Sequence, residues 1–512
     1  MAFSSVMSAV LQGLFVVPVY VEADVSNGLP MFHMVGDLSS EVKEASERVR
    51  TAIRNSGISI PPRKIVINMA PATVRKRGAS FDLPVALAVL SALGVISSGK
   101  LQSAMVVGEL SLEGKVKKVS GILPIVMEAK ERGMEYCIVP SENVSEAALV
   151  EGIDILGVEN LQEVCECLNQ ETLIFRKKHI DNEMKFCAFE TSYLDYSDVQ
   201  GQEAVKRATE VAVAGGHNIL FVGPPGSGKT MIAKRLPTIL PIPSLEESME
   251  ITKIYSVLGM VDKEKPLITG RPFRSVHHTV TKAALIGGGN IPVPGEISLA
   301  HGGVLFLDEL AEFQKPVLEV LRQPLEERKI RITRSHGNYL FPSNFILAAA
   351  MNPCPCGNYP DLSRCNCTPG QIRQYLSRIS QPFLDRIDIC IETPRIPYEE
   401  LRSNRTPESS EEIRKRVIKE REIQQNRYQG TEIMTNAMLT AKEVEVYCRI
   451  GGEEEKLMKQ AFTSLSLTAR TYHKILKVAR TIADLDAAQQ ISKGHLMEAI
   501  GYRTLDKKYW GR

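Results

Sequence analysis

The 512-residue sequence lacks the features that mark membrane and secreted proteins. No apolar stretch free of charged residues reaches the roughly 20 residues that a membrane-spanning helix needs. Met1–Val16 has neither a basic start nor a small-residue cleavage pattern, so no secretory signal is predicted. We therefore expect a cytoplasmic protein, in which the ten cysteines would not form disulfides.

An excess of charge of one sign is also lacking. The chain has 62 Lys and Arg residues against 60 Asp and Glu, a net charge of +2. This balance neither demands nor excludes a nucleic-acid partner, and any basic surface must be local. The length predicts about two to four domains. The hydrophobic content of 44% is ample for their cores. No internal repeat or low-complexity tract is visible.

A glycine-rich segment has the pattern of a phosphate-binding loop, G-x-x-x-x-G-K-[ST]. Its residues are Gly223, Pro224, Pro225, Gly226, Ser227, Gly228, Lys229 and Thr230. The apolar run Asn218–Val222 before it is typical of a buried parallel strand, and Met231–Leu236 after it is typical of a helix. In that context backbone N–H groups and the helix N-terminus would hold phosphates, Lys229 would reach the β- and γ-phosphates, and Thr230 would bind Mg²⁺.

A second buried strand, Gly303–Leu307, ends in two adjacent carboxylates, Asp308 and Glu309. Packing alone rarely explains such a pair, because burying an uncompensated charge is costly. We expect Asp308 to hold Mg²⁺ through water and Glu309 to polarise the attacking water. With the glycine-rich loop, these acids predict ATP hydrolysis, or at least ATP binding.

The pattern of elements divides the chain into four parts. Residues 1–170 resemble an α/β domain without a phosphate-binding loop of its own. Residues 171–197 show little periodicity and are predicted to be a linker. Residues 198–394 alternate helices with buried strands, as βαβ units do, and hold the ATPase core. Residues 395–512 contain helices without strands, which predicts a helical C-terminal domain.

Further residues lie where AAA+ ATPases carry catalytic groups. Ile346–Asn352 resembles the strand whose final Asn, sensor 1, contacts the γ-phosphate and the lytic water. Arg386 resembles the arginine finger, which would face the nucleotide of the next subunit. Arg378 is a second candidate, and a surface ion pair is the alternative role for Arg386. Arg470 resembles the sensor 2 arginine that the helical domain lays on the nucleotide, although arginines at helix starts are common.

The segments around these motifs carry a more specific resemblance. They are Ala214–Asn218, Arg271–Thr279, Pro294–His301 and Asn352–Gly357. Over nearly its whole length the chain is similar to the YifB/ComM family of magnesium-chelatase-like AAA+ ATPases. The resemblance implies an α/β multidomain fold. It would combine a Lon-protease-like N-terminal domain (ribosomal S5 domain 2-like), a P-loop AAA+ core and an α-helical C-terminal lid domain.

The same resemblance implies an activity and partners. The best-understood branch of the family is a hexameric DNA helicase that promotes branch migration during natural transformation. ATP, Mg²⁺, single-stranded or branched DNA and a homo-hexamer are thus implied, and no membrane. The alternative is a chelatase-type ATPase that uses the same core to remodel a protein partner. A non-catalytic scaffold is a third hypothesis, against which the intact Asp308, Glu309 and Asn352 argue.

The N-terminal domain departs from a working Lon-type protease. That chemistry needs a serine activated by a lysine. Ser80 lies where the nucleophile would be, but position 123, where the lysine is expected, is Leu123. We interpret the domain as a non-proteolytic scaffold or a substrate-engaging module.

Four cysteines lie within fourteen residues, as two C-x-C pairs: Cys354, Cys356, Cys365 and Cys367. Four thiolates suit tetrahedral Zn²⁺, although the C-x-C spacing is tighter than usual. A structural zinc is therefore predicted, with free thiols or a redox pair as alternatives. Cys165 and Cys167 form another C-x-C pair but have no second pair nearby, so no metal is expected there.

Lys329–Arg334 alternates charged and apolar residues and precedes a Gly-Asn turn, which predicts a β-hairpin. In similar AAA+ proteins a hairpin at this place faces the central pore. Lys329, Arg331 and Arg334 could then follow a phosphate backbone. An ordinary solvated hairpin face is the alternative. A second insertion at Gly287–Pro294 could form another pore loop.

The adjacent His277 and His278 suggest a metal site at first sight. Adjacent side chains diverge on most backbones. We therefore expect the pair to make structural hydrogen bonds.

Overall fold

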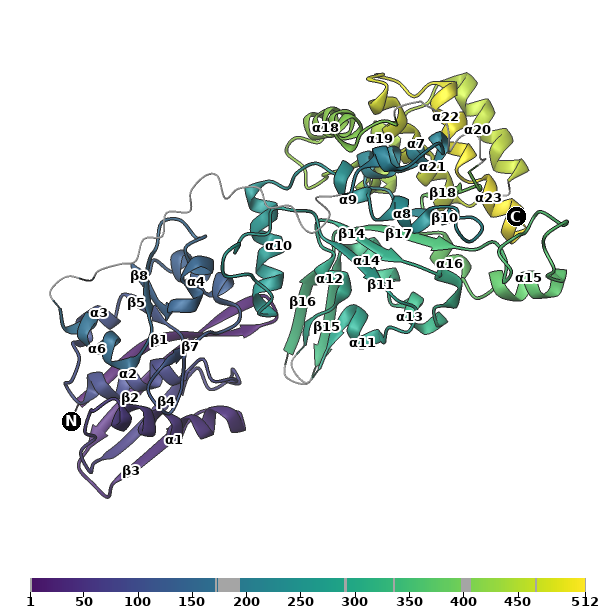
Figure 1. The fold of residues 1–512 in the computed structure, drawn as a ribbon. Helices are drawn as coiled ribbons and strands as arrows, with labels where there is room; N and C mark the ends of the chain where they lie inside the picture. Colours follow the sequence, from purple (N-terminus) through teal and green to yellow (C-terminus); the bar gives the residue numbers. More distant parts are fainter. Residues whose placement is uncertain are drawn as a thin grey trace.

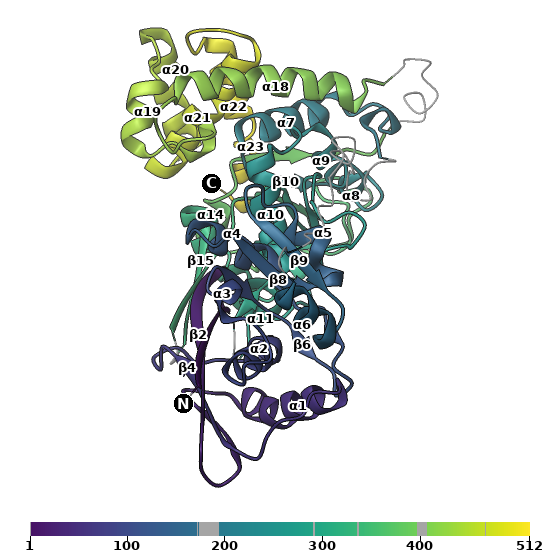
Figure 2. The ribbon, with the colours of Figure 1, turned by 90° about the vertical axis from the view of Figure 1, so that its left-hand side faces the viewer.

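The structure is a computed structural model that describes residues 2–170, 173, 194–289, 292–334, 337–396, 407–465 and 467–511. An N-terminal α/β domain, a central domain with a parallel sheet and a C-terminal helical region follow one another along the chain (Figure 1). In the rotated view the helical region and the N-terminal domain lie at opposite ends of the molecule (Figure 2). Most of the predicted linker, residues 171–197, lies outside the described residues.

The N-terminal domain is built on a seven-stranded sheet with the order β3-β4-β2-β1-β5-β8-β9. The strands are β1 Ala2–Gln12, β2 Phe15–Ser26, β3 Met31–Val35, β4 Lys64–Ala70, β5 Ala104–Val106, β8 Tyr136–Pro140 and β9 Asp154–Val158. β1 and β2 form a long antiparallel hairpin, in register from Ala2↔Val25 to Gln12↔Phe15. Gly13 closes its turn in the left-handed region, at φ +67°.

Helices and a short ribbon complete this domain. They are α1 Ser40–Asn55, α2 Asp82–Ala92, α3 Ser98–Leu101, α4 Ile122–Glu131, α5 Val144–Ala147, α6 Leu161–Asn169, and the strands β6 Glu109–Leu110 and β7 Val116–Lys117. Helix α2 packs on β1, β2 and α1, and nearly all its side chains are buried. It is apolar on every side because it lies inside the core rather than on its surface.

The central domain contains a five-stranded sheet with the order β11-β14-β17-β10-β18. Its strands are β10 Ile219–Val222, β11 Phe273–Val276, β14 Val304–Leu307, β17 Ile346–Met351 and β18 Ile389–Glu392. All neighbouring pairs are parallel. The carboxyl ends of all five strands therefore lie at one edge of the sheet, where open α/β sheets bind ligands.

Successive side chains of β10 pack into the cores on opposite faces of the sheet, because side chains alternate along a strand. Ile219 and Phe221 belong to a core that continues into the helical region. Leu220 and Val222 belong to the core on the other face. The helices of this domain are α7 Glu203–Gly215, α8 Lys229–Ala233, α9 Leu236–Ile239, α10 Leu245–Val257, α11 Lys282–Ile286, α12 Glu296–Leu299, α13 Lys315–Glu319, α14 Arg322–Glu327, α15 Pro369–Leu376 and α16 Gln381–Leu384.

Two hairpins extend from the central domain. β15 Lys329–Arg334 pairs with β16 Gly337–Pro342, which confirms the predicted hairpin. In the second insertion, β12 Gly287–Gly288 pairs with β13 Val293–Pro294. Residues 290–291 and 335–336, at the ends of the two hairpins, lie outside the described residues.

The C-terminal region is helical, as predicted, among its described residues. Its helices are α18 Ser410–Arg427, α19 Ala441–Tyr447, α20 Gly452–Ser464, α21 Ala469–Leu485, α22 Lys493–Gly501 and α23 Thr504–Trp510. Helix α21 packs on α7 and α18, and α23 returns to β18 and α15. The predicted fold class, an AAA+ core with a Lon-like domain and a helical region, is confirmed by this architecture and by the relatives described below.

The N-terminal and central domains meet at α10, which packs against α4 (Figure 1). The N–H groups of Gly121 and Leu123 donate to the carbonyl and hydroxyl of Ser256, at 2.8 and 3.4 Å. The Ser256 hydroxyl donates to Glu146, and burial raises the pKa of this carboxyl. Leu123, which replaces the expected protease lysine, is thus fully buried beneath the contact between the two domains.

Among the described residues, no helix combines the length and the apolar composition needed to cross a bilayer.

Candidate functional site

The glycine-rich loop connects β10 to α8 at the carboxyl edge of the sheet. Gly226 and Gly228 adopt the left-handed region, with φ values of +74° and +87°. Lys229 begins α8, and its amine donates to the carbonyls of Gly223 and Pro224, at 2.7 and 2.9 Å. The ammonium group therefore lies inside the loop, where the phosphates of a nucleotide would be.

The two carboxylates that follow β14, Asp308 and Glu309, lie beside this loop. The hydroxyl of Thr230 donates to Asp308 Oδ2 at 2.9 Å, which places a hydroxyl and a carboxylate side by side as Mg²⁺ ligands require. Glu309 has a left-handed backbone, φ +53°, and its N–H donates to Asp308 Oδ1 at 2.9 Å. This bend leaves the Glu309 side chain 57% exposed, so its carboxylate is accessible to a water molecule.

Asn352 completes the same edge. It follows β17, whose Met351 is opposite Val222 in the parallel register, so the ends of β17 and β10 are neighbours. The amine of Lys229 donates to the Asn352 amide oxygen at 3.2 Å. The structure thus brings together three segments that the sequence separates by roughly eighty and forty residues, as the parallel sheet requires.

Burial lowers the pKa of Lys229 to about 8, and the nearby Asp308 carboxylate opposes this shift only in part. Near neutral pH the amine is charged, and it loses its proton as the pH rises through 8. Phosphate groups favour the charged amine, so a nucleotide complex would hold this proton to higher pH than the free protein.

We therefore expect the affinity for an ATP analogue with Mg²⁺ to fall as the pH rises above about 8, by up to about tenfold per pH unit. Binding at pH 8 to 9 should take up a proton. Calorimetric titration in buffers of different ionisation enthalpy measures both quantities. Lys229→Arg, which stays charged, should lose the dependence above pH 8. Equal wild-type affinities at pH 7 and pH 9.5 would show that Lys229 does not carry the charge that holds phosphate.

The two histidines contact this site, which sequence reasoning missed. His278 Nδ1 lies 3.2 Å from Glu309 Oε2, and His277 Nδ1 lies 2.9 Å from the Thr279 hydroxyl. The rings are 4.0 Å apart, so the expected divergence of the two side chains is wrong. They lie here because β11 pairs with β14 and ends at the same edge, with Val276 opposite Leu307. Polar residues just after a predicted buried strand were the signal that could have revealed this contact.

Arg386 lies at the opposite edge of the sheet. It precedes β18, and its carbonyl accepts from the Asn218 side chain at 3.0 Å, just before β10 begins. Its guanidinium donates to Glu326 Oε1 at 2.7 Å and to the Arg322 carbonyl at 3.3 Å. The four residues of β10 place about 13 Å between the two edges. Arg386 therefore lies at the far edge of the sheet from the glycine-rich loop of its own chain.

Arg470 also contacts Glu326 Oε1, at 2.5 Å, and not the residues around Lys229. It does so because α21 packs on α7 and α18, so its first turn faces α14 at the amino edge of the sheet. The sensor 2 role of Arg470 stays a prediction. Arg378, the second finger candidate, is half exposed and pairs with Glu312 at 2.6 Å.

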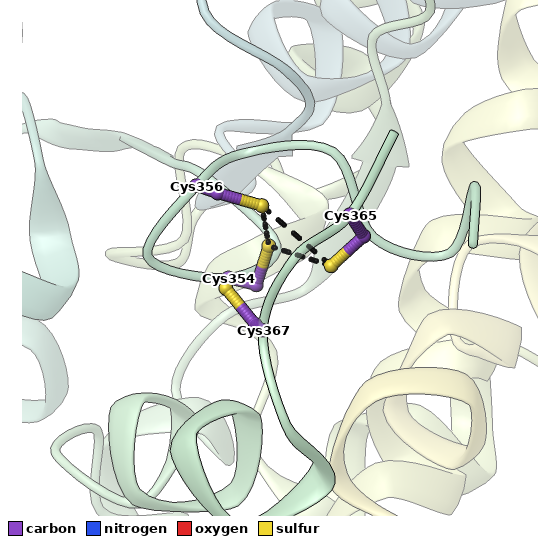
Figure 3. Close-up of side chains that lie close together, drawn as sticks. All are labelled: Cys354, Cys356, Cys365 and Cys367. Carbon is purple, nitrogen blue, oxygen red and sulfur yellow. Dashed lines mark hydrogen bonds between the residues drawn. The ribbon is translucent and has the colours of Figure 1, made fainter. Parts of the chain in front are cut away.

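The four clustered cysteines converge on one point (Figure 3). Their sulfurs are 3.4 Å apart for Cys354 and Cys356, 3.8 Å for Cys354 and Cys365, and 3.6 Å for Cys356 and Cys365. The Cys367 sulfur lies within 4.8 Å of all three. Tetrahedral Zn²⁺ with Zn–S bonds of about 2.3 Å needs sulfurs about 3.8 Å apart, so the four residues fit this metal. A hydrogen bond from the Asn358 backbone lowers the pKa of Cys356, whereas the neighbouring cysteines raise the pKa of Cys365 and of Cys367.

The β15–β16 hairpin has one apolar and one basic face. Ile330, Ile332 and Phe341 are buried in the core, and Phe341 lies against Gly13 at the tip of the N-terminal hairpin. Lys329, Arg331 and Arg334 are exposed. Among the ion pairs of the described residues, none includes these three side chains. The hairpin thus presents three exposed cations without an ion-pair partner among the described residues, from a base that is packed in the core.

The structure agrees that position 123 supplies no lysine to Ser80. Leu123 is buried beneath α10, and Ser80 is held by its carbonyl, which accepts from Gly108 at 2.9 Å. Lys76, four residues before Ser80, is buried, and its amine donates to the carbonyl of Pro71.

Three family models match the chain. The model described as magnesium chelatase, subunit ChlI, matches residues 195–401. The models described as subunit ChlI of Mg-chelatase and as its C-terminal part match residues 21–143 and 407–503.

Two curated relatives match the chain over nearly its whole length. YifB of Salmonella typhimurium is 41% identical over 508 residues, which cover 99% of this chain and 98% of YifB. The competence protein ComM of Haemophilus influenzae is 41% identical over 508 residues, with the same coverage. Lon protease 2 of Bacillus subtilis is 33% identical over 129 residues, 25% of this chain and 23% of the protease.

Proposed function

Because the chain belongs to the YifB/ComM family of magnesium-chelatase-like AAA+ ATPases, we propose that it is an ATP-hydrolysing ring motor that acts on DNA. The observation that carries the proposal is the exposed basic face of the β15–β16 hairpin, whose cations have no ion-pair partner among the described residues, in the same domain as the nucleotide site. Hydrolysis at the carboxyl edge of the sheet would drive the hairpin along a phosphate backbone.

Each residue of the nucleotide site has a role in this proposal. The backbone N–H groups of Gly226, Ser227 and Gly228 and the Lys229 amine hold the phosphates of ATP. Thr230 and Asp308 hold Mg²⁺, and their 2.9 Å hydrogen bond is the contact that the ion would replace. Glu309 orients and polarises the attacking water, and Asn352 contacts the γ-phosphate.

The arginines at the amino edge favour a ring, for which we propose a homo-hexamer. Arg386 and Arg470 share one carboxylate, Glu326, at the opposite edge of the sheet from the loop of their own chain. They can stabilise charge on a nucleotide only if it belongs to a neighbouring copy. The phosphates of that neighbour would compete with Glu326 for the two guanidinium groups.

DNA is favoured over a protein partner by the chemistry of the hairpin and by one relative. Three cations on a ribbon suit regularly spaced phosphates, which carry no sequence information. The relative ComM is named a competence protein, which favours a branch-migration activity in recombination or natural transformation. The alternative is remodelling of a protein partner, which the match to magnesium chelatase supports.

We expect removal of the three cations, in Lys329→Ala/Arg331→Ala/Arg334→Ala, to weaken DNA binding similarly for all sequences, because a motor must advance over any base. The slope of log affinity against log salt should flatten by up to about 0.7 to 0.9 for each lost phosphate contact. ATP binding should be unchanged, since the hairpin is separate from the glycine-rich loop. Fluorescence anisotropy at several salt concentrations measures the binding.

A matched control removes three exposed cations from the helical region, in Lys419→Ala/Lys456→Ala/Lys459→Ala. It changes the net charge equally and should leave the salt slope as in the unaltered protein. If the hairpin variant keeps full affinity and the same slope, another element contacts DNA.

We also propose that Cys354, Cys356, Cys365 and Cys367 bind one structural Zn²⁺. Four thiolates fill the tetrahedral coordination sphere and leave no position for substrate.

Protein purified without added metal is expected to contain about one zinc per chain by elemental analysis. Cys365→Ser should lose it. Cys167→Ser, which alters the C-x-C pair outside the four-cysteine cluster, should retain the zinc. A folded wild-type protein without zinc would refute the metal site.

A further inference from the structure

The cysteine loop, residues 353–367, contacts the phosphate-binding (glycine-rich) loop, residues 223–230, at Gly357. This residue has a left-handed backbone, φ +79°, and a Cβ built on it would lie 2.4 Å from Cδ and 2.9 Å from Cγ of Pro225. Real Cβ atoms do not approach carbon so closely, so glycine is required for this contact. Pro225 is followed directly by Gly226, one of the two left-handed residues of the phosphate-binding loop.

The cysteine loop also joins the nucleotide site through the chain itself. Cys354 comes two residues after Asn352, whose amide oxygen accepts from Lys229 at 3.2 Å. Cys354 is fully buried, whereas Cys365 and Cys367, at the far end of the loop, are partly exposed. Bonds that hold all four sulfurs together would therefore fix the loop at both of its contacts with the nucleotide site.

Two long-range contacts join the loop to the C-terminal part of the chain, since Arg395 donates to Asn358 Oδ1 at 3.1 Å and the rings of Tyr359 and Tyr509 meet edge to face. Its other hydrogen bonds are mostly short-range. The Cys365 N–H donates to the Asp361 carbonyl at 2.8 Å, and the Asn358 side chain donates to the Arg364 carbonyl at 3.3 Å. The Tyr359 N–H is directed at the Cys354 sulfur, at 3.4 Å. The sulfurs are thus the centre about which this segment is folded.

We propose that a zinc-class metal held by the four thiolates positions the phosphate-binding loop by seating Gly357 against Pro225, so that the affinity for ATP depends on the metal. This rests on the proposed nucleotide and zinc sites and adds a link between them. Gly357 and Pro225 are positioning residues in this scheme, because neither supplies a group to the reaction.

The first test is Gly357→Ala. The added methyl group should displace Pro225 and weaken binding of a fluorescent ATP analogue with Mg²⁺ by roughly 10- to 100-fold, as overpacking of this size implies. The KM for ATP should rise while kcat at saturation is largely kept. A variant whose only defect was a smaller fraction of folded protein would show the reverse, a lower apparent kcat with an unchanged KM.

Gly430→Ala is the matched control. Gly430 has nearly the same backbone, φ +81°, but a Cβ there would meet nothing within 4 Å. It therefore reproduces the backbone strain without the contact, and should lower the melting temperature without changing ATP affinity. Equal losses of ATP affinity in both variants would overturn the role of the contact.

The second test is rescue. In Pro225→Ala/Gly357→Ala, the two ring atoms that the new methyl group would meet are gone. The double variant should bind the analogue more tightly than Gly357→Ala does, a coupling that a double-mutant cycle measures. Additive losses would contradict the proposed packing between the two loops.

The third test removes the metal. Cys365→Ser, or wild-type protein stripped with a chelator, should bind the analogue more weakly in parallel with its loss of zinc, and added zinc should restore the stripped wild type. Unchanged ATP affinity after complete loss of zinc overturns this inference but leaves both proposed sites intact. A wild type that binds ATP but contains no zinc overturns the inference and the zinc site. A wild type that binds no ATP refutes the proposed function itself.

Discussion

Glu309→Gln is expected to bind ATP with Mg²⁺ as the wild type does and to hydrolyse it roughly 10²- to 10⁴-fold more slowly. The amide keeps the size of the side chain but cannot accept a proton from the attacking water. Lys229→Ala should instead lose ATP binding, because its amine lies within the loop that would hold the phosphates, 2.7 Å from the Gly223 carbonyl. Analogue binding and single-turnover hydrolysis separate the two effects.

Glu309 is half exposed and contacts His278, so its carboxylate is accessible to water rather than enclosed by the loop. Equal loss of nucleotide binding in both variants would mean that Glu309 holds the nucleotide rather than the water. The division of roles between the loop and the acidic strand would then be wrong.

Arg386→Ala should leave ATP binding nearly intact and lower hydrolysis by about 10³- to 10⁵-fold, the range seen for arginine fingers. The physical reason is its position at the amino edge of the sheet, about 13 Å from the carboxyl edge where its own chain would bind ATP. It can act only on the nucleotide of a neighbouring copy. Steady-state hydrolysis and analogue binding measure the two quantities.

Mixing Arg386→Ala with Lys229→Ala should restore part of the activity, because some interfaces then join an intact finger to an intact loop. Arg378→Ala, the other candidate, serves as the comparison and should lose less activity than Arg386→Ala. No recovery at any ratio, in rings shown to be mixed, would count against action between subunits.

The sequence predicted the carboxyl edge of the core well, for a physical reason. Residues 223–230 form a local motif whose backbone and side chains act together, and Asp308 and Asn352 each follow a continuous apolar strand. Parallel strands bring such ends together whatever lies between them. The contacts of Lys229 with Asn352 and of Thr230 with Asp308 follow from that rule.

Elements whose pattern depends on distant partners were harder to predict. Strand β1 has no clear strand pattern in the sequence, because it buries Ser4 and Ser8, which break the apolar alternation. The short helices α19 and α23 are too short to give a strong sequence pattern, since tertiary packing more than their own length stabilises them. The packing of Gly357 on Pro225 has no signal in the sequence, since any glycine in a loop looks alike.

The contacts that side chains of the helical region make with the central domain were the least predictable feature. The resemblance implied that Arg470 lies on a nucleotide but did not specify of which copy, and the packing of α21 on α7 and α18 places it beside Glu326. Whether a helix-start arginine faces one edge of a sheet or the other depends on how the helical region packs on the core, which no local motif records.

The central claim is tested most directly by the ATP hydrolysis rate of the wild-type protein without DNA and with single-stranded, double-stranded or branched DNA, at low salt and saturating ATP. The proposal predicts that DNA raises the rate, most of all single-stranded or branched DNA, and that Lys329→Ala/Arg331→Ala/Arg334→Ala keeps only the DNA-free rate. A rate that no DNA changes, together with a rise when a protein partner is added, would contradict the DNA motor and favour protein remodelling.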